Sequence, residues 1–185
     1  FISPYFSSLE EDWKSHQITH LRISQIKQVI LTDVEHPEGS FQIIRNGDKH
    51  FDIVALANGQ KMPIYDTLKL YEHLGTYRNL NFEFFVDSLS QAATDSILSL
   101  KFKELTIVDT AGNTTKINFY HLLNEYNTEE FDYNPEFMEA YNRDKFYITL
   151  GEDKTHFYIC QFFVFDRIIQ PIGYYFPDSE MIAIQ

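Results

Sequence analysis

Cysteine, glycine and basic residues are scarce in this chain of 185 residues, and each scarcity excludes a class of function. Cys160 is the single cysteine, which excludes an internal disulfide and a thiol-rich zinc site. The 7 glycines form neither a Gly-x-Gly-x-x-Gly motif nor a phosphate-binding loop. Only 15 Lys and Arg stand against 27 Asp and Glu, and the resulting net charge of −12 argues against a nucleic-acid partner.

Long apolar runs are also missing, since no stretch approaches the roughly 20 apolar residues that a membrane-spanning helix needs. Residue 1 is Phe rather than Met, and neither a charged n-region nor an apolar h-region follows it. We therefore expect a processed or truncated product, with any signal or membrane anchor lying upstream of it.

Aromatic residues, by contrast, are abundant. The chain has 17 Phe, 12 Tyr and 1 Trp, which make up 16% of it, and 44% of its residues are hydrophobic. Such a supply of large apolar side chains is typical of a folded domain rather than a disordered one. The aromatic residues are concentrated late in the chain, because 17 of the 30 lie in residues 119–176.

Turn signals between alternating runs predict a sheet built from hairpins. Asn46-Gly47 separates two alternating segments, and both residues favour the positive φ angles of a tight hairpin turn. Two further hairpins are expected within residues 103–119 and 146–162. Two short helices are expected at about 66–75 and 88–99, with Asp66 and Ser88 as their capping residues. The expected fold class is α+β with mainly antiparallel sheet.

The length of the chain suits a single compact domain over residues 1–185. An alternative is a pair of similar β-rich subdomains, residues 18–86 and 88–176, each carrying one helix. Residue identity between the two halves is low, so a repeat would be structural rather than visible in the sequence.

Residues 122–144 form the most irregular stretch and are expected to be a long loop. The stretch has one base, Arg143, and seven acids: Glu125, Glu129, Glu130, Asp132, Glu136, Glu139 and Asp144. Part of it resembles the start of an EF-hand loop, but Phe and Arg stand where that loop requires Gly and Glu. The EF-hand is excluded, while an irregular cation site stays open as an alternative to a solvated acidic loop.

No catalytic motif is recognisable. His16 and His20 have the spacing of a helical zinc pair, but the residues between them look extended. Ser40 lacks the glycines of a nucleophile elbow, and Cys160 lies in a strand pattern that should leave it buried and inert. Four carboxylates lie in or beside apolar segments: Asp33, Asp52, Glu83 and Asp166. We expect no catalytic residue, metal ion or cofactor.

Two groups of segments resemble a known family: residues 1–6, 12–13 and 40–41 near the start, and residues 142–147 and 161–168 near the end. Together they are similar to envelope proteins of Bacteroidetes that are grouped as domain-of-unknown-function family 4340. The resemblance implies the C-terminal part of a lipoprotein or membrane-anchored protein in the periplasm or cell envelope. It implies no enzymatic residues.

The leading interpretation is a non-catalytic extracytoplasmic binding or assembly module with a protein partner, whose membrane contact is limited to an upstream anchor. The alternatives are a carbohydrate-binding or hydrolase domain, since aromatic rings stack on sugars, and a structural spacer.

Five aromatic side chains interleaved with the acids are the candidate binding residues: Tyr126, Phe131, Tyr133, Phe137 and Tyr141. Either they pin a long loop onto the sheet or they form the contact surface. Phe162, Phe163 and Phe165 are expected to pack the last strand and the turn that follows it.

Overall fold

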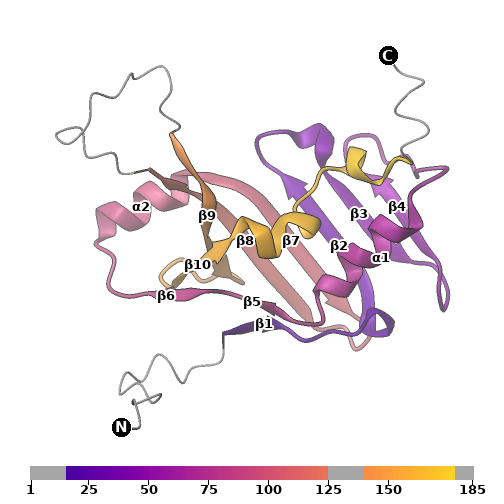
Figure 1. Cartoon of the computed structure of the whole chain (residues 1–185), viewed down its shortest axis with the longest axis horizontal. Coiled ribbons are helices and arrows are strands. Elements are labelled where there is room, and N and C mark those ends of the chain that lie inside the picture. Colours follow the sequence, from indigo (N-terminus) through magenta and orange to yellow (C-terminus); the bar gives the residue numbers. More distant parts are fainter. Residues whose placement is uncertain (1–15, 125–139, 178–185) are drawn as a thin grey trace, which may run out of the picture.

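The computed structural model describes residues 16–124 and 140–177, and an antiparallel sheet of eight strands dominates it (Figure 1). Its strands, in the order in which they lie side by side, are β4 (Phe51–Ala55), β3 (Phe41–Arg45), β2 (Ile26–Asp33), β7 (Lys101–Asp109), β8 (Thr114–Leu123), β9 (Tyr141–Leu150), β10 (Phe157–Gln161) and β6 (Phe84–Val86). A second sheet pairs β1 (Gln17–Thr19) with β5 (Leu80–Asn81).

Three α-helices lie among the described residues: α1 (Thr67–Thr76), α2 (Gln91–Ser99) and α3 (Phe162–Phe165). Four 3₁₀ turns accompany them, at Ile23–Gln25, Pro37–Gly39, Asp166–Ile168 and Ile172–Tyr175. The α+β class with mainly antiparallel sheet is therefore confirmed. The expected count of two helices is wrong, because residues 162–165, expected to form the end of the last strand and the turn after it, form a helical turn.

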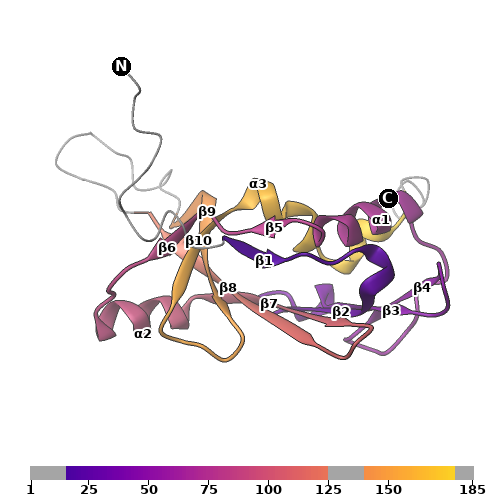
Figure 2. The ribbon, with the colours of Figure 1, turned by 90° about the horizontal axis from the view of Figure 1, so that it is seen from below.

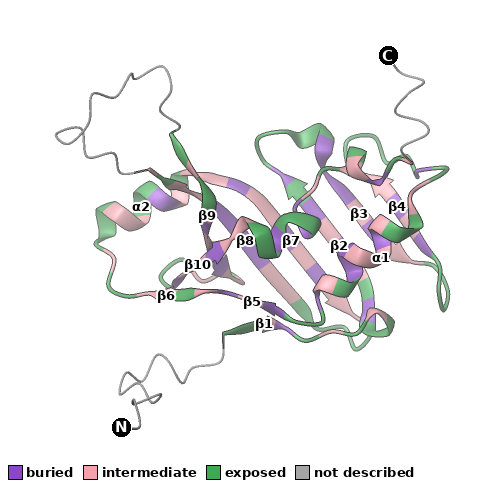
Figure 3. Ribbon diagram, in the orientation of Figure 1, coloured by how far each residue is buried: buried purple, intermediate pink, exposed green. Residues whose placement is uncertain are grey.

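The alternation of side chains along β8 shows how the layers are built. Phe119 is fully buried in the main core, and its ring centroid lies 6.0 Å from that of Phe165, just after β10. The next residue, Tyr120, points to the other face and packs with Ile97 of α2 and with Phe157. α1 and α3 therefore cover one face of the sheet, seen edge-on in Figure 2, while α2 packs on the other. Figure 3 shows buried and less buried residues alternating along the central strands.

Two expected helices are confirmed, with one cap corrected. The carboxylate of Asp66 accepts hydrogen bonds from the backbone of Leu68 and Lys69, as expected for the N-cap of α1. At α2 the capping side chain is Ser90, which accepts from the backbone N–H of Ala93, and not the expected Ser88. Ser88 instead has a φ of 49°, in the left-handed region rather than in the extended conformation typical of an N-cap.

The expected loop over residues 122–144 is too long at both ends. β8 continues through Leu123, and β9 begins at Tyr141, with Leu123 and Tyr141 facing each other in the ladder. Acidic and polar residues at these strand ends weaken the sequence signal for strand without preventing the pairing. The middle of this stretch, residues 125–139, lies outside the described residues.

Strands from both halves of the chain share the large sheet. β2 pairs with β7, and the pairing runs from Ile26 opposite Asp109 to Asp33 opposite Lys103. β6, from the first half, pairs with β10 from the end of the second. A cut between residues 86 and 88 would therefore leave β6 and its partner strand on different pieces.

Candidate binding surface around helix α3

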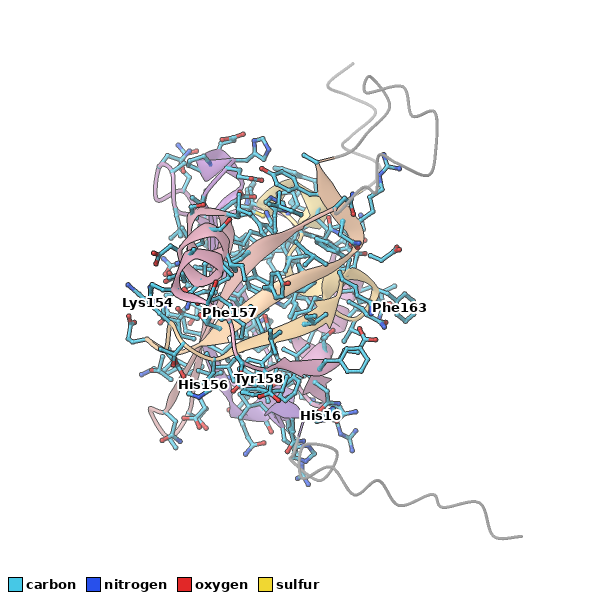
Figure 4. All side chains as sticks on the ribbon, turned by 90° about the vertical axis from the view of Figure 1, so that its left-hand side faces the viewer. His16, Lys154, His156, Phe157, Tyr158 and Phe163 are labelled. Atoms are coloured by element: carbon cyan, nitrogen blue, oxygen red, sulfur yellow. The ribbon has the colours of Figure 1, made fainter. Side chains whose placement is uncertain are left out.

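The single turn of α3 sends its aromatic side chains in different directions. Successive residues of a helix are rotated by about 100°, so residues three apart share a face while the two between them do not. Phe162 and Phe165 both pack on Phe146, with ring centroids 4.6 and 5.3 Å from it. Phe163 is consequently turned outward and is 91% exposed, and Figure 4 shows it projecting from the surface. Val164, the next residue, is 39% exposed, so the two side chains form an exposed apolar pair, and contiguous apolar surface of this kind is where interaction sites are sought.

Three hollows border α3, and Phe162 lines all of them. The largest, about 830 Å³, lies between α3 and the end of α1, and Arg78 and Arg167 contribute to its walls. A second, about 680 Å³, lies at the start of β9 beside Tyr141, and a third, about 400 Å³, lies between them along Arg143. We call this region the α3 surface and define it by these residues: Arg78, Tyr141, Arg143, Lys145, Phe162, Phe163, Val164 and Arg167.

The charge of the α3 surface is opposite to that of the protein as a whole. Four basic side chains line its hollows, namely Arg78, Arg143, Lys145 and Arg167, against two acidic ones, Asp144 and Asp166. The chain as a whole has a net charge of −12. The lining of the hollows therefore has two more basic than acidic side chains, although Glu72 and Glu83, just outside the lining, pair with Arg167 and Lys145.

Two ion pairs of the α3 surface are loose or partly exposed. Arg167 Nε lies 3.7 Å from a carboxylate oxygen of Glu72, and both side chains are well exposed. Lys145 Nζ lies 3.2 Å from the Glu83 carboxylate and 5.2 Å from the centre of the Phe84 ring. An exposed pair such as Arg167 with Glu72 contributes little to stability, so an incoming acidic group can compete for that cation.

Tyr141 is one of three aromatic rings that stack on one another at the end of the sheet, together with Phe102 and His121. The Phe102 and His121 ring centroids lie 4.3 Å apart, and those of His121 and Tyr141 lie 4.0 Å apart at an interplanar angle of 8°. His121 Nε2 also lies 2.9 Å from a carboxylate oxygen of Glu35. Tyr141 itself is 38% exposed and lines the second hollow. Its ring is therefore both packed on the sheet and presented to solvent.

The structure places one of the five candidate binding residues at this surface. Tyr141 belongs to it, whereas the other four lie outside the described residues: Tyr126, Phe131, Tyr133 and Phe137. The packing role expected for Phe165 is confirmed, since it is fully buried, and that expected for Phe163 is wrong. Four apolar residues in a row, Phe-Phe-Val-Phe, directly after a strand indicate core packing when they are taken as part of that strand. The helical turn that they form instead places Phe163 at the surface.

The candidate catalytic groups have structural partners. Asp33 pairs with Lys103, Asp52 with Lys61, and Glu83 with Lys145; Asp166 accepts from the side-chain amide of Gln170. The Cys160 thiol is buried, as expected, and this burial raises its pKa well above its usual range. Within residues 16–124 and 140–177, no three His, Cys, Asp or Glu side chains gather closely enough to hold a metal ion.

No family model, curated protein or solved structure matches the chain. Among the described residues, no helix has the length and apolar character to cross a membrane. The resemblance to family 4340 stays a prediction, and the α3 surface is the strongest basis for an argument about function.

Proposed function

We propose that this chain is a non-catalytic binding or assembly module of the cell envelope, and that it binds a partner protein at the α3 surface. The observation that carries the proposal is Phe163, a 91% exposed ring with hollows on either side. Full burial of such a side chain against a partner contributes about 1.5–3 kcal/mol. Its location in the envelope rests on the resemblance described above.

The chemistry of the surface favours an acidic partner segment that carries an apolar or aromatic side chain. The basic groups of Arg78, Arg143 and Arg167 surround the exposed ring, and arginine forms bidentate pairs with carboxylates. An apolar side chain of the partner would pack beside Phe163 in the 830 Å³ hollow. Because the rest of the protein is strongly acidic, the same partner would be repelled from most of the remaining surface.

Site-specific photo-crosslinking tests the proposal. A photoreactive phenylalanine analogue replaces Phe163 in one protein and Ile64 in a matched control, since Ile64 is 54% exposed and lines none of the three hollows. After irradiation in envelope extract, mass spectrometry identifies the crosslinked protein. Its affinity for the unmodified chain and for Phe163→Ala is then measured with purified components.

A specific crosslink from position 163, together with at least a tenfold loss of affinity in Phe163→Ala, is the expected result; tenfold corresponds to about 1.4 kcal/mol. Equal crosslinking from positions 163 and 64 would overturn the proposal. Unchanged affinity in Phe163→Ala would do the same and would favour a spacer, in which surface substitutions are silent. Selective binding to a glycan array that depends on Phe163 would favour the carbohydrate-binding alternative instead.

A further inference from the structure

A small polar pocket lies on the face of the sheet opposite the α3 surface. Its walls come from Lys101 and Lys116 of the neighbouring strands β7 and β8, from the C-terminal part of α2, and from the turn between β9 and β10. Its volume is about 260 Å³. Figure 4 shows Lys154, which lines this pocket, and Phe163 on opposite sides of the molecule. The pocket is therefore independent of the surface considered above.

Two lysines are held at this pocket by one carboxylate. Glu104 accepts from Lys101 Nζ at 2.6 Å through one oxygen and lies 3.3 Å from Lys116 Nζ through the other. All three side chains are only 27–29% exposed. Lys154 adds a third cation at the rim, where Asp153 adds a second negative charge with its carboxylate engaged by Thr155 and His156. Before Glu152 is counted, the three lysines therefore outnumber the two carboxylates by one charge.

The floor of the pocket is preorganised by a buried amide. Asn118 is 6% exposed, and its oxygen accepts from Lys101 Nζ at 2.7 Å. Its NH₂ group donates to Thr149 Oγ1 at 3.2 Å and to the carbonyl of Gly151 at 3.1 Å. These bonds fix the amide and the lysine ammonium in one geometry, as a binding site requires.

An anionic oxygen already occupies the mouth of the pocket. The carboxylate of Glu152 lies 3.0 Å from Lys116 Nζ, and the Glu152 side chain is 83% exposed. It follows Gly151, whose φ of 63° forms the tight turn that brings the carboxylate to the lysine. An ion pair with so exposed a partner is weak, so an external anion can replace it.

We propose that this pocket binds the phosphate group of a small ligand, which displaces the Glu152 carboxylate from Lys116. Lysine ammonium groups bind phosphate as point charges, and Lys101 of β7, Lys116 of β8 and Lys154 of the β9–β10 turn all line this pocket. The small volume fits a phosphate monoester of few atoms rather than a nucleotide. The phosphate belongs either to a free metabolite or to a lipid headgroup.

Solution NMR of the whole chain tests the proposal through the side-chain NH₂ of Asn118 and the backbone N–H of Gly151. Glycerol 3-phosphate and inorganic phosphate are titrated against sodium chloride at matched ionic strength and pH. Saturable shifts at these two groups with the phosphates, and none with chloride, are expected. A further experiment compares vesicles that contain phosphatidate with pure phosphatidylcholine vesicles. If only the phosphatidate vesicles shift the signals of these two groups, the bound phosphate belongs to a lipid headgroup.

Two substitutions and a control separate binding from general charge effects. Lys116→Gln should weaken phosphate binding at least tenfold, whereas Glu152→Gln should strengthen it, because the competing carboxylate is removed. Lys27→Gln, which removes an exposed lysine of β2, should leave the affinity unchanged. The proposal is overturned if no phosphate compound causes saturable shifts, or if Glu152→Gln binds no more tightly than the parent. Because Glu152 is exposed, that variant is expected to fold normally, and its result is decisive even if Lys116→Gln unfolds.

Discussion

His73 Nδ1 and Tyr175 Oη lie 2.5 Å apart and join α1 to the last 3₁₀ turn across 102 residues of sequence. The other ring nitrogen of His73 lies 2.7 Å from the hydroxyl of Tyr77. The imidazole is fully buried between these hydroxyls, and burial lowers its pKa to about 3. His73 is therefore neutral in the folded protein, with one nitrogen donating and the other accepting.

This buried imidazole should make the protein sensitive to mild acid. In the unfolded chain a histidine titrates near 6.5, so between about pH 6.5 and 3 the unfolded state binds a proton that the folded state does not. The free energy of unfolding should therefore fall as the pH falls through this window, by up to about 5 kcal/mol in total. Urea unfolding between pH 7 and pH 5.5, above the range where most carboxylates titrate, measures the slope.

The matched variants for this measurement are His73→Leu and His36→Gln. His73→Leu should be less stable at pH 7 but should lose much less stability on acidification. His36, which is exposed, should have no such role, so His36→Gln should keep the slope of the parent. An equally steep slope in His73→Leu would contradict the assignment.

Removing one hydroxyl from the cluster should be costly. Tyr175→Phe leaves the ring in place but deprives His73 Nδ1 of its partner, and an unsatisfied buried polar group costs about 1–3 kcal/mol. Tyr174→Phe is the control, because that side chain is only half-buried and its ring contacts are kept. We expect its free energy of unfolding to change by less than about 0.5 kcal/mol. Equal losses in the two variants would show that the hydrogen bond to His73 is not the cause.

The nearly buried ion pair of Asp33 and Lys103 should matter more than the surface pairs. Their side chains are 4% and 14% exposed, and the Asp33 carboxylate also accepts from the backbone N–H of His36 at 2.9 Å. Lys103→Met leaves this carboxylate without its cation and should cost about 3–5 kcal/mol. Lys27→Met, at an exposed position on β2, should be almost neutral in the same denaturation assay. A loss in Lys103→Met no larger than that of Lys27→Met would refute the role of the pair.

Much of the sheet can be read from the sequence, because local signals determine its hairpins. Asn46-Gly47 predicts the β3–β4 turn, where Gly47 has a φ of 99°, and Asp66 predicts the start of α1. The β3–β4, β7–β8 and β9–β10 hairpins all join strands that are consecutive in the chain. The adjacency of β2 with β7 and of β10 with β6 was not predicted, since it depends on contacts between distant residues.

The candidate site was predicted only in part, for a similar reason. Tyr141 was singled out because it lies among acids, but nothing in its neighbourhood indicated a stack on His121. Phe163 was assigned to the core because four apolar residues in a row are too few to show a helical period. Exposure at that position depends on where β10 stops, and strand ends are set by tertiary packing.

Phe163 and Phe165 should respond in opposite ways to truncation. Phe163→Ala removes an exposed ring and should change the free energy of unfolding by less than about 0.5 kcal/mol. Phe165→Ala empties a fully buried position and should cost about 3–5 kcal/mol. Thermal and urea unfolding of both variants checks this. A large loss in Phe163→Ala would assign that ring a structural role and remove the main support for the α3 surface.

Cys160 should behave as an internal reporter of unfolding. Its thiol is fully buried and its pKa is raised by burial, so the reactive thiolate is scarce in the folded state. A thiol reagent should label it only when the protein opens, with a rate that rises with urea in parallel with unfolding. Rapid labelling in native buffer, measured by mass spectrometry, would contradict the placement of this strand.

The position of β6 at the far edge of the sheet has a consequence for biosynthesis. Residues 84–86 are made before β7, β8, β9 and β10, yet they lie beyond all four, paired with β10 alone in the large sheet. On the ribosome, Phe84 and Phe85 therefore emerge long before the strand that receives them. Until residues 157–161 have left the exit tunnel, the backbone of this segment lacks its partner strand, and Phe85 lacks the Tyr158 ring on which it packs. Any chaperone binding to this segment during translation should accordingly end when the last strand is added.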